Sequence, residues 1–153
     1  MRSALVLVLL LAAACGSSPE PGHGAGESAT LQIRTASGIR SFEVEVADTT
    51  AERRTGLMGR ETLSPFDGMA FLWTGPVEGS FWMKDTLIPL SIAFWDQEGR
   101  IVSIMDMEPC RADPCPTYGP GAPYVGALEV TQGELARRGV GVGDTVDLTI
   151  RGA

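Results

Sequence analysis

The chain has 153 residues, a length typical of a single domain. Hydrophobic residues make up 44% of it and charged residues 20%, and these ordinary globular values exclude a wholly disordered chain. The formal net charge of −7 gives a surface that repels phosphate backbones, so we expect no nucleic-acid partner. The 19 glycines and 10 prolines indicate many turns between short elements and favour β structure.

The first 15 residues, MRSALVLVLLLAAAC, have the features of an export signal. Arg2 supplies a positive charge, and residues 4–11 form an apolar run that is too short to span a bilayer. Three alanines then precede Cys15, an arrangement that resembles a bacterial lipoprotein signal. The resemblance implies a signal peptide at residues 1–14 and a diacylglycerol thioether on Cys15. The alternative is an ordinary secretory signal in which Cys15 has no role.

Residues 15–28 are predicted to be a lipid anchor followed by a flexible tether. The tether is rich in Gly, Ser, Pro and Glu and has no large apolar residue, so it cannot bury enough surface to fold. The one histidine of the chain, His23, lies in it and is expected to be inert. The predicted protein is therefore exported and lipid-anchored to a bacterial membrane, on its periplasmic or cell-surface side, with one globular domain at residues 29–153.

The first part of this domain is predicted to be a β-hairpin and a short helix. Residues 30–35 (TLQIRT) and 42–46 (FEVEV) alternate between apolar and polar positions, as half-buried strands do. Thr49 and Glu52 have the spacing of a capping box, with Asp48 as the alternative cap, which predicts a helix that ends near Met58, before Gly59. Residues 69–73 (MAFLW) then form a predicted buried strand.

The central stretch, residues 79–94 (GSFWMKDTLIPLSIAF), is predicted to be a second hairpin. Its two apolar runs are short and rich in aromatic and β-branched residues, and Pro89 would break a helix. Between the runs lies a polar corner of Lys84, Asp85 and Thr86. The sequence therefore places polar groups beside the core at this corner.

The remaining elements complete a mainly β fold of the α+β type. Strands are predicted at residues 100–107, 124–130 and 144–151, with a long Pro- and Gly-rich loop at 108–123 and a short helix at 131–138. No βαβ repeat is evident, so we expect a compact, mainly antiparallel sheet, barrel-like or sandwich, of seven or eight short strands with two short helices.

Several segments together resemble the bacterial and archaeal family called domain of unknown function 192. They are RRTGLMGRETL, DGMAFLW, SFWMKDTLIPLSIAF, EGRIVSI and ALEVTQGELARRGVGVGDTV. The resemblance covers residues 30–151 and implies a compact, mainly β domain that is often exported and has no established activity. This chain departs from the family's usual pattern at Asp85, where Asn is usual, and at Ser91, where Asp is usual.

Cys110 and Cys115 are predicted to form a local disulfide. With Cys15 consumed by lipid, the two thiols left in an oxidising compartment would pair across the CRADPC loop. A metal-binding pair, a redox-active pair and two free thiols remain alternatives, although zinc prefers four ligands and no histidine lies nearby.

Cationic residues near the central corner predict either a ligand site or a structural ion pair. Arg53, Arg54 and Arg60 flank a GLMG segment, and with Lys84 they would suit a carboxylate, a phosphate or an anionic sugar. The structural interpretation, which the sequence favours, is that one arginine pairs with Asp85 or Asp67 to hold the helix on the sheet and that the others are solvated. The candidate ligand-binding residues are Arg54, Arg60, Trp82, Lys84, Asp85 and Thr86.

These observations favour a binding or accessory module of the cell envelope over an enzyme. The chain has no Gly-x-Ser-x-Gly motif, no phosphate-binding loop and no histidine base in its folded part, and we expect no cofactor and no metal. Its expected partners are the membrane, through Cys15, and an unknown small molecule or envelope protein. One alternative is an envelope enzyme that acts on sugar or cell-wall substrates with Asp85 and Lys84 as its acid-base pair. Another is a structural envelope protein without a small-molecule site.

Overall fold

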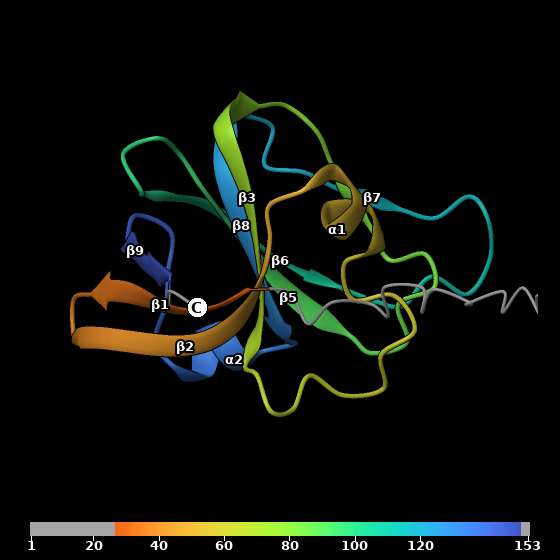
Figure 1. Ribbon diagram of the computed structural model, residues 1–153, viewed down its shortest axis with the longest axis horizontal. Coiled ribbons are helices and arrows are strands. Elements are labelled where there is room, and N and C mark those ends of the chain that lie inside the picture. The colour runs from red at the N-terminus through yellow and green to blue at the C-terminus, as the bar shows by residue number, and fades with distance from the viewer. Residues whose placement is uncertain (1–26, 151–153) are drawn as a thin grey trace, which may run out of the picture.

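The computed structural model describes residues 27–150, without the side chain of residue 150. The predicted signal peptide, Cys15, His23 and most of the predicted tether lie outside the described residues. The described part is mainly β, with nine strands and two short helices, so the predicted fold class is confirmed while the strand count is higher than expected (Figure 1). No helix in this part of the chain is long and apolar enough to cross a membrane.

Seven strands form one sheet in the order β6-β5-β8-β3-β2-β1-β9. Their bounds are β1 Ser28–Thr35, β2 Gly38–Ala47, β3 Gly68–Val77, β5 Leu90–Trp95, β6 Ile101–Met107, β8 Tyr124–Thr131 and β9 Thr145–Ile150. A second sheet consists of β4 (Phe81–Trp82) and β7 (Thr117–Tyr118). The helices are α1 (Thr50–Thr55) and α2 (Glu134–Arg137), each shorter than the sequence pattern predicts.

The predicted first hairpin is present. β1 and β2 pair antiparallel with Leu31 opposite Phe42, and both of these side chains are fully buried. The predicted capping box is also present, because the Thr49 hydroxyl accepts from the Glu52 amide while the Glu52 carboxylate accepts from the Thr49 amide. Period-two alternation and a local cap are short-range signals, which explains why the sequence was sufficient for them.

The large sheet is mainly antiparallel, as expected, but it contains one parallel pair that the sequence pattern does not predict. β2 and β3 pair in parallel, with Val46 opposite Ala70, and α1 lies in the connection between them. The antiparallel partner of β3 is β8. The helix was recognisable from its cap, but pairing direction depends on how the segment after α1 returns to the sheet, and no local pattern encodes that path.

The sheet is strongly coiled but does not close into a barrel. In Figure 1, β1 and β2 run across the direction of β3 and β8. At one end the outer strands meet through an isolated bridge between Arg100 and Thr145, supported by a 2.8 Å hydrogen bond from the Ile101 amide to the Asp144 carbonyl. The expected barrel-like shape is thus approached at one end only.

The predicted second hairpin is also wrong. β4 pairs with β7 in the small sheet, whereas β5 lies between β6 and β8 in the large one. The chain makes a turn in which the Thr86 amide donates to the Met83 carbonyl, and Asp85 adopts a left-handed backbone conformation with φ of 56°. The two apolar runs therefore enter different sheets, because the corner redirects the chain instead of folding it back on itself.

Both faces of the large sheet are buried at its central strands β5 and β8 and in the first half of β3. One face packs inside the coil around Phe42, Leu128 and Val130, together with Leu135 of α2. The other face carries Phe71, Ile92 and Phe94 and is covered by residues from the α1 turn, the central corner and the loop before β8. All six residues of β5 are buried, as expected for a strand between two hydrophobic layers. The candidate site lies on this second face.

Candidate functional site

A cavity of about 410 Å³ opens on the second face of the sheet. It lies between α1 with its following turn on one side and residues 77–82 on the other, and β3 and β8 form its floor. Five aromatic side chains share its wall, which are Phe71, Trp73, Phe81, Trp82 and Tyr124. A pocket of this size and lining is suited to a small organic molecule. We call it the aromatic pocket.

The aromatic wall is organised by edge-to-face contacts. The Trp73 ring lies 6.2 Å from Phe81 and 5.3 Å from Tyr124, measured between centroids, and Phe71 lies 5.0 Å from Phe81. Phe71 and Trp73 share a face because they alternate along β3, as the predicted strand at residues 69–73 implies. Such T-shaped pairs fix ring orientation, so the wall is ordered before any ligand enters.

Glu129 brings a carboxyl group to the floor of the pocket. It lies on β8 with Met69 of β3 on one side and Ile92 of β5 on the other, and its residue is only 4% exposed. Within residues 27–150, no side chain pairs with this carboxyl, yet neither oxygen is sealed off, because Glu129 lines the cavity. A buried acid without a partner is costly, so its position beside a cavity points to a ligand.

Burial determines the charge of this group. Loss of hydration raises the pKa of Glu129 from its ordinary value of 4.5 to about 8. The carboxyl is therefore protonated and uncharged at neutral pH, and it can donate a hydrogen bond into the pocket. Burial likewise raises the pKa of Tyr124, so its phenol also stays neutral.

The backbone at Glu129 is held close to β3. A Cβ atom built on Gly68 would lie 2.0 Å from the Glu129 carbonyl oxygen, so only glycine allows this approach of the two strands. The carboxyl is thus carried by a tightly packed central strand instead of a loop, and its position relative to the aromatic wall is set by the sheet.

Two arginines of α1 line the pocket, and only one of them is held by hydrogen bonds to the described part of the protein. The guanidinium of Arg53 lies 5.1 Å from the centroid of the Trp73 ring, and its Nη1 donates to the Leu72 carbonyl at 2.8 Å and to the Asp48 carbonyl. Arg54 is exposed and forms no ion pair with any residue that the structure describes. Arg53 is therefore part of the wall, whereas Arg54 is available to a ligand.

Three of the six predicted ligand-binding residues line the aromatic pocket, namely Arg54, Trp82 and Thr86. Trp82 is 51% exposed, and Thr86 is buried. The other three residues are directed elsewhere. The structure therefore brings the α1 turn and the central corner together, as the sequence predicts, but with only part of the expected side-chain set.

Arg60, Lys84 and Asp85 do not line the pocket. Arg60 forms an ion pair with Glu45 of β2, and this hydrogen bonding raises the pKa of its guanidinium. The ammonium of Lys84 donates to both carboxylate oxygens of Asp113, at 3.0 and 2.8 Å, which raises the pKa of Lys84. Asp85 is exposed, and its backbone carbonyl accepts from the Gly59 amide at 2.8 Å.

The ion pairs join other residues than those that the sequence predicts. An arginine was expected to pair with Asp85 or Asp67, but the partner of Arg60 is Glu45, and Asp67 pairs with Arg138 at 2.7 Å. Arg60 still links the segment after α1 to the sheet, as the structural alternative proposed. The error concerns the partner, which is set by long-range packing.

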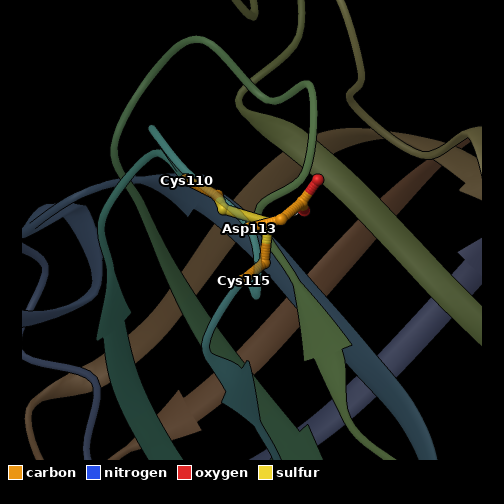
Figure 2. A group of neighbouring side chains, drawn as sticks. All are labelled: Cys110, Asp113 and Cys115. Atoms are coloured by element: carbon orange, nitrogen blue, oxygen red, sulfur yellow. A yellow bond between two sulfur atoms is a disulfide. The ribbon is translucent and has the colours of Figure 1, made fainter.

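The predicted disulfide between Cys110 and Cys115 is present, with an S–S distance of 2.05 Å. Figure 2 shows the two cysteines with Asp113 between them in the loop. Their sulfur atoms and an Asp113 oxygen lie within 4.8 Å of one another, but the sulfurs bond to each other and are not free thiolate ligands. Through Asp113 the loop also holds Lys84, and the Cys110 amide donates to the Met83 carbonyl at 3.3 Å.

Glu129 was missed in the sequence, although a signal was present. It is the one charged residue in the predicted strand YVGALEV. A carboxyl at a core position is unusual enough to mark a candidate site. Recognising it required knowing that both faces of β8 are covered, because on a half-exposed strand the same residue would be an ordinary solvent-facing acid.

The comparisons with known proteins agree with this architecture. The solved structures that are similar to the chain include the following two. A candidate transcription regulator from Sinorhizobium meliloti 1021 is 29% identical, with a TM-score of 0.73 over 82% of this chain and 97% of the other. A protein of unknown function from Novosphingobium aromaticivorans DSM 12444 is 32% identical, with a TM-score of 0.72 over 84% of this chain and 89% of the other.

None of the curated proteins matches the chain. A family model does match, over residues 31–148, and these residues contain the aromatic pocket, Glu129 and the disulfide loop. The family is described as an uncharacterized ACR. The chain thus belongs to the family called domain of unknown function 192 (DUF192).

Proposed function

We propose that this protein is a lipid-anchored binding module of the bacterial cell envelope that holds a small organic molecule in the aromatic pocket. The observation that carries the proposal is the Glu129 carboxyl, which is buried, has no partner among the described residues and faces a cavity with five aromatic side chains. A ligand that hydrogen-bonds to this carboxyl would offset the cost of its burial.

Binding is better supported than catalysis by the groups around the pocket. General acid-base chemistry on a bound molecule commonly uses two groups with separated pKa values. The acid-base pair considered for the sequence, Asp85 and Lys84, is not among the residues that line the cavity. Among the described residues, one other carboxyl group besides Glu129 lines the cavity, that of Glu78, which is exposed at the rim. This arrangement supports recognition by one buried polar group and a shaped apolar wall.

The envelope part of the proposal rests on the N-terminal sequence and the disulfide. The apolar run that ends in three alanines and Cys15 has the pattern of a lipoprotein signal, and the tether would give the domain reach from the membrane. A disulfide between Cys110 and Cys115 suits an oxidising compartment. The net charge of −7 opposes phosphate binding and therefore argues against a nucleic-acid partner, although the Sinorhizobium structure is described as a candidate transcription regulator.

The test is a thermal-shift screen of the purified protein against sugars, muropeptide fragments, organic acids and aromatic metabolites. A ligand at 100 times its dissociation constant stabilises a protein by about 2.7 kcal/mol, which a melting curve detects readily. We expect at least one compound that stabilises the wild type and the surface variant Glu98→Gln but not Glu129→Leu. If every stabilising compound acts equally on Glu129→Leu, the aromatic pocket is not the binding site.

A further inference from the structure

We infer that the molecule recognised by the aromatic pocket is an anion with a flat ring body, which takes a hydrogen bond from Glu129 at the floor and pairs with Arg54 at the mouth. This inference rests on the proposed function and specifies the chemical class of its ligand. It is carried by three parts of the site, which are the floor, the wall and the mouth.

The floor favours an acceptor oxygen on the ligand. The Glu129 carboxyl keeps its proton at neutral pH because burial raises its pKa to about 8. A protonated carboxyl donates one hydrogen bond, and ether, carbonyl and hydroxyl oxygens accept it. Such a contact satisfies the buried acid without burying a new charge, whereas a ligand ammonium would require two desolvated charges to be held together.

The wall opposes a cationic ligand for a second reason. Aromatic cages often bind organic cations through the faces of their rings. Here Arg53 already lies over the Trp73 ring at 5.1 Å and is fixed there by its hydrogen bond to the Leu72 carbonyl. A ligand cation in this part of the pocket would lie close to that guanidinium and would be repelled by it. The remaining ring edges and faces suit a flat apolar body.

The mouth supplies the charge that selects an anion. Arg54 is exposed on α1, lines the pocket and has no ion pair within the described part of the chain. A guanidinium binds carboxylates and phosphates through two parallel hydrogen bonds. Besides Glu129, the lining formed by the described residues contains two arginines and one other acidic residue, Glu78, so cationic side chains outnumber acidic ones at the mouth of this otherwise acidic protein.

Three probes with one ring body separate these features. They are 6-methoxy-2-naphthoate, which is anionic, and the corresponding primary alcohol and primary amine, which are neutral and cationic. Dissociation constants would be measured by calorimetry at pH 7 with the purified full-length protein. We expect the naphthoate to bind at least tenfold more tightly than the alcohol and the amine to bind most weakly.

Variants assign each part of the preference. Arg54→Gln should reduce the affinity for the naphthoate to that for the alcohol, while Arg34→Gln, which removes an exposed arginine on β1, should leave it unchanged. Glu129→Gln should retain binding because an amide also donates, and Glu129→Leu should lose at least tenfold. In the wild type, naphthoate affinity should fall as the pH rises through about 8, and in Glu129→Gln it should not.

The inference is overturned if the amine binds most tightly or if Glu129→Gln abolishes binding, since Glu129 would then act as a negative charge. In either case the pocket still binds a small molecule, so the proposed function stands. Failure of all three probes, when the screen has yielded a Glu129-dependent ligand, also overturns the inference. If neither the probes nor the screen gives a Glu129-dependent ligand, the proposed function fails as well.

Discussion

The burial of the Glu129 carboxyl reduces the stability of this protein. Its neighbours in the sheet, Met69 and Ile92, are apolar, and within residues 27–150 no group pairs with its carboxyl. A leucine at this position would extend the hydrophobic layer, whereas the acid reduces stability as soon as the unfolded chain can ionise it. A buried ionisable group that reduces stability and faces a cavity is typical of a binding site.

The pH dependence of unfolding tests this description of Glu129. The unfolded chain releases the Glu129 proton near pH 4.5, whereas the folded protein retains it up to about pH 8. The contribution of Glu129 to the free energy of unfolding therefore falls as the pH rises between these values, because at this residue the folded state binds more protons than the unfolded state does. Between pH 5 and pH 8 the wild type should lose on the order of 4 kcal/mol relative to Glu129→Gln.

The measurement is urea unfolding of both proteins across this pH range. Glu98→Gln, which removes an exposed carboxylate from the turn before β6, is the control and should follow the wild type. Parallel pH profiles for the wild type and Glu129→Gln would show that Glu129 ionises normally in the folded protein. The predicted donor at the floor of the pocket would then be absent.

At the residue scale, sequence reasoning succeeded where a signal is local and failed where packing decides. The spacing of Cys110 and Cys115 was sufficient for the disulfide, and the spacing of Thr49 and Glu52 for the cap. The adjacent Lys84 and Asp85 were expected to act together, but Lys84 turns to Asp113, 29 residues further along the chain. Such a partner is determined by the path of the intervening loop.

At the scale of elements, the pocket depends on the small sheet. β4 carries Phe81 and Trp82, and it pairs with β7 and not with any strand of the large sheet. The loop before β7 is closed by the disulfide and tied to the central corner by Lys84–Asp113 and by the hydrogen bond from Cys110 to Met83. One wall of the pocket is thus positioned by a cross-linked loop.

Removing the cross-link should therefore loosen this wall. The double variant Cys110→Ser with Cys115→Ser should lower the free energy of unfolding by about 2 kcal/mol, a modest loss because the closed loop is short. Amide hydrogen exchange should accelerate at β4 and at the corner and remain slow in β5, which is buried at every position. Reduction of the wild type should reproduce both effects, and unchanged exchange at β4 would show that β7 holds this wall without the disulfide.

Alternating sequence patterns predict which segments are strands but not how the strands pair in the sheet. Alternation identified β1, β2 and β9, because each has one face directed toward the core inside the coil. It could not give the parallel pairing of β2 with β3 or assign β4 and β5 to different sheets. Direction and neighbour order are properties of the connections, and residues 56–67 and 83–89 contain no periodic pattern to reveal them.

At the scale of the whole molecule, the position of the pocket follows from the layering of the fold. The coiled sheet encloses one hydrophobic face within itself, with Leu135 of α2 packed against it. The opposite face is covered by short elements and loops, which do not fill the space above Glu129. A cavity forms where this second layer is incomplete, so the same segments that complete the core also shape the site.

The N-terminal sequence predicts how this molecule is held in the cell. If Cys15 carries a diacylglycerol group, the protein is anchored stably, because two acyl chains bind a membrane far more strongly than one does. Cys15→Ala should move the protein from the membrane fraction to the soluble fraction and remove the lipid mass from its N-terminal peptide.

The variant lacking Cys110 and Cys115 is the matched control and should stay in the membrane. A Cys15→Ala protein that remains membrane-bound would contradict lipidation and would assign the attachment to another part of the chain. Because residues 16–27 separate Cys15 from β1 in the sequence and are predicted to be a tether, the melting temperature of the domain should be the same with and without the lipid.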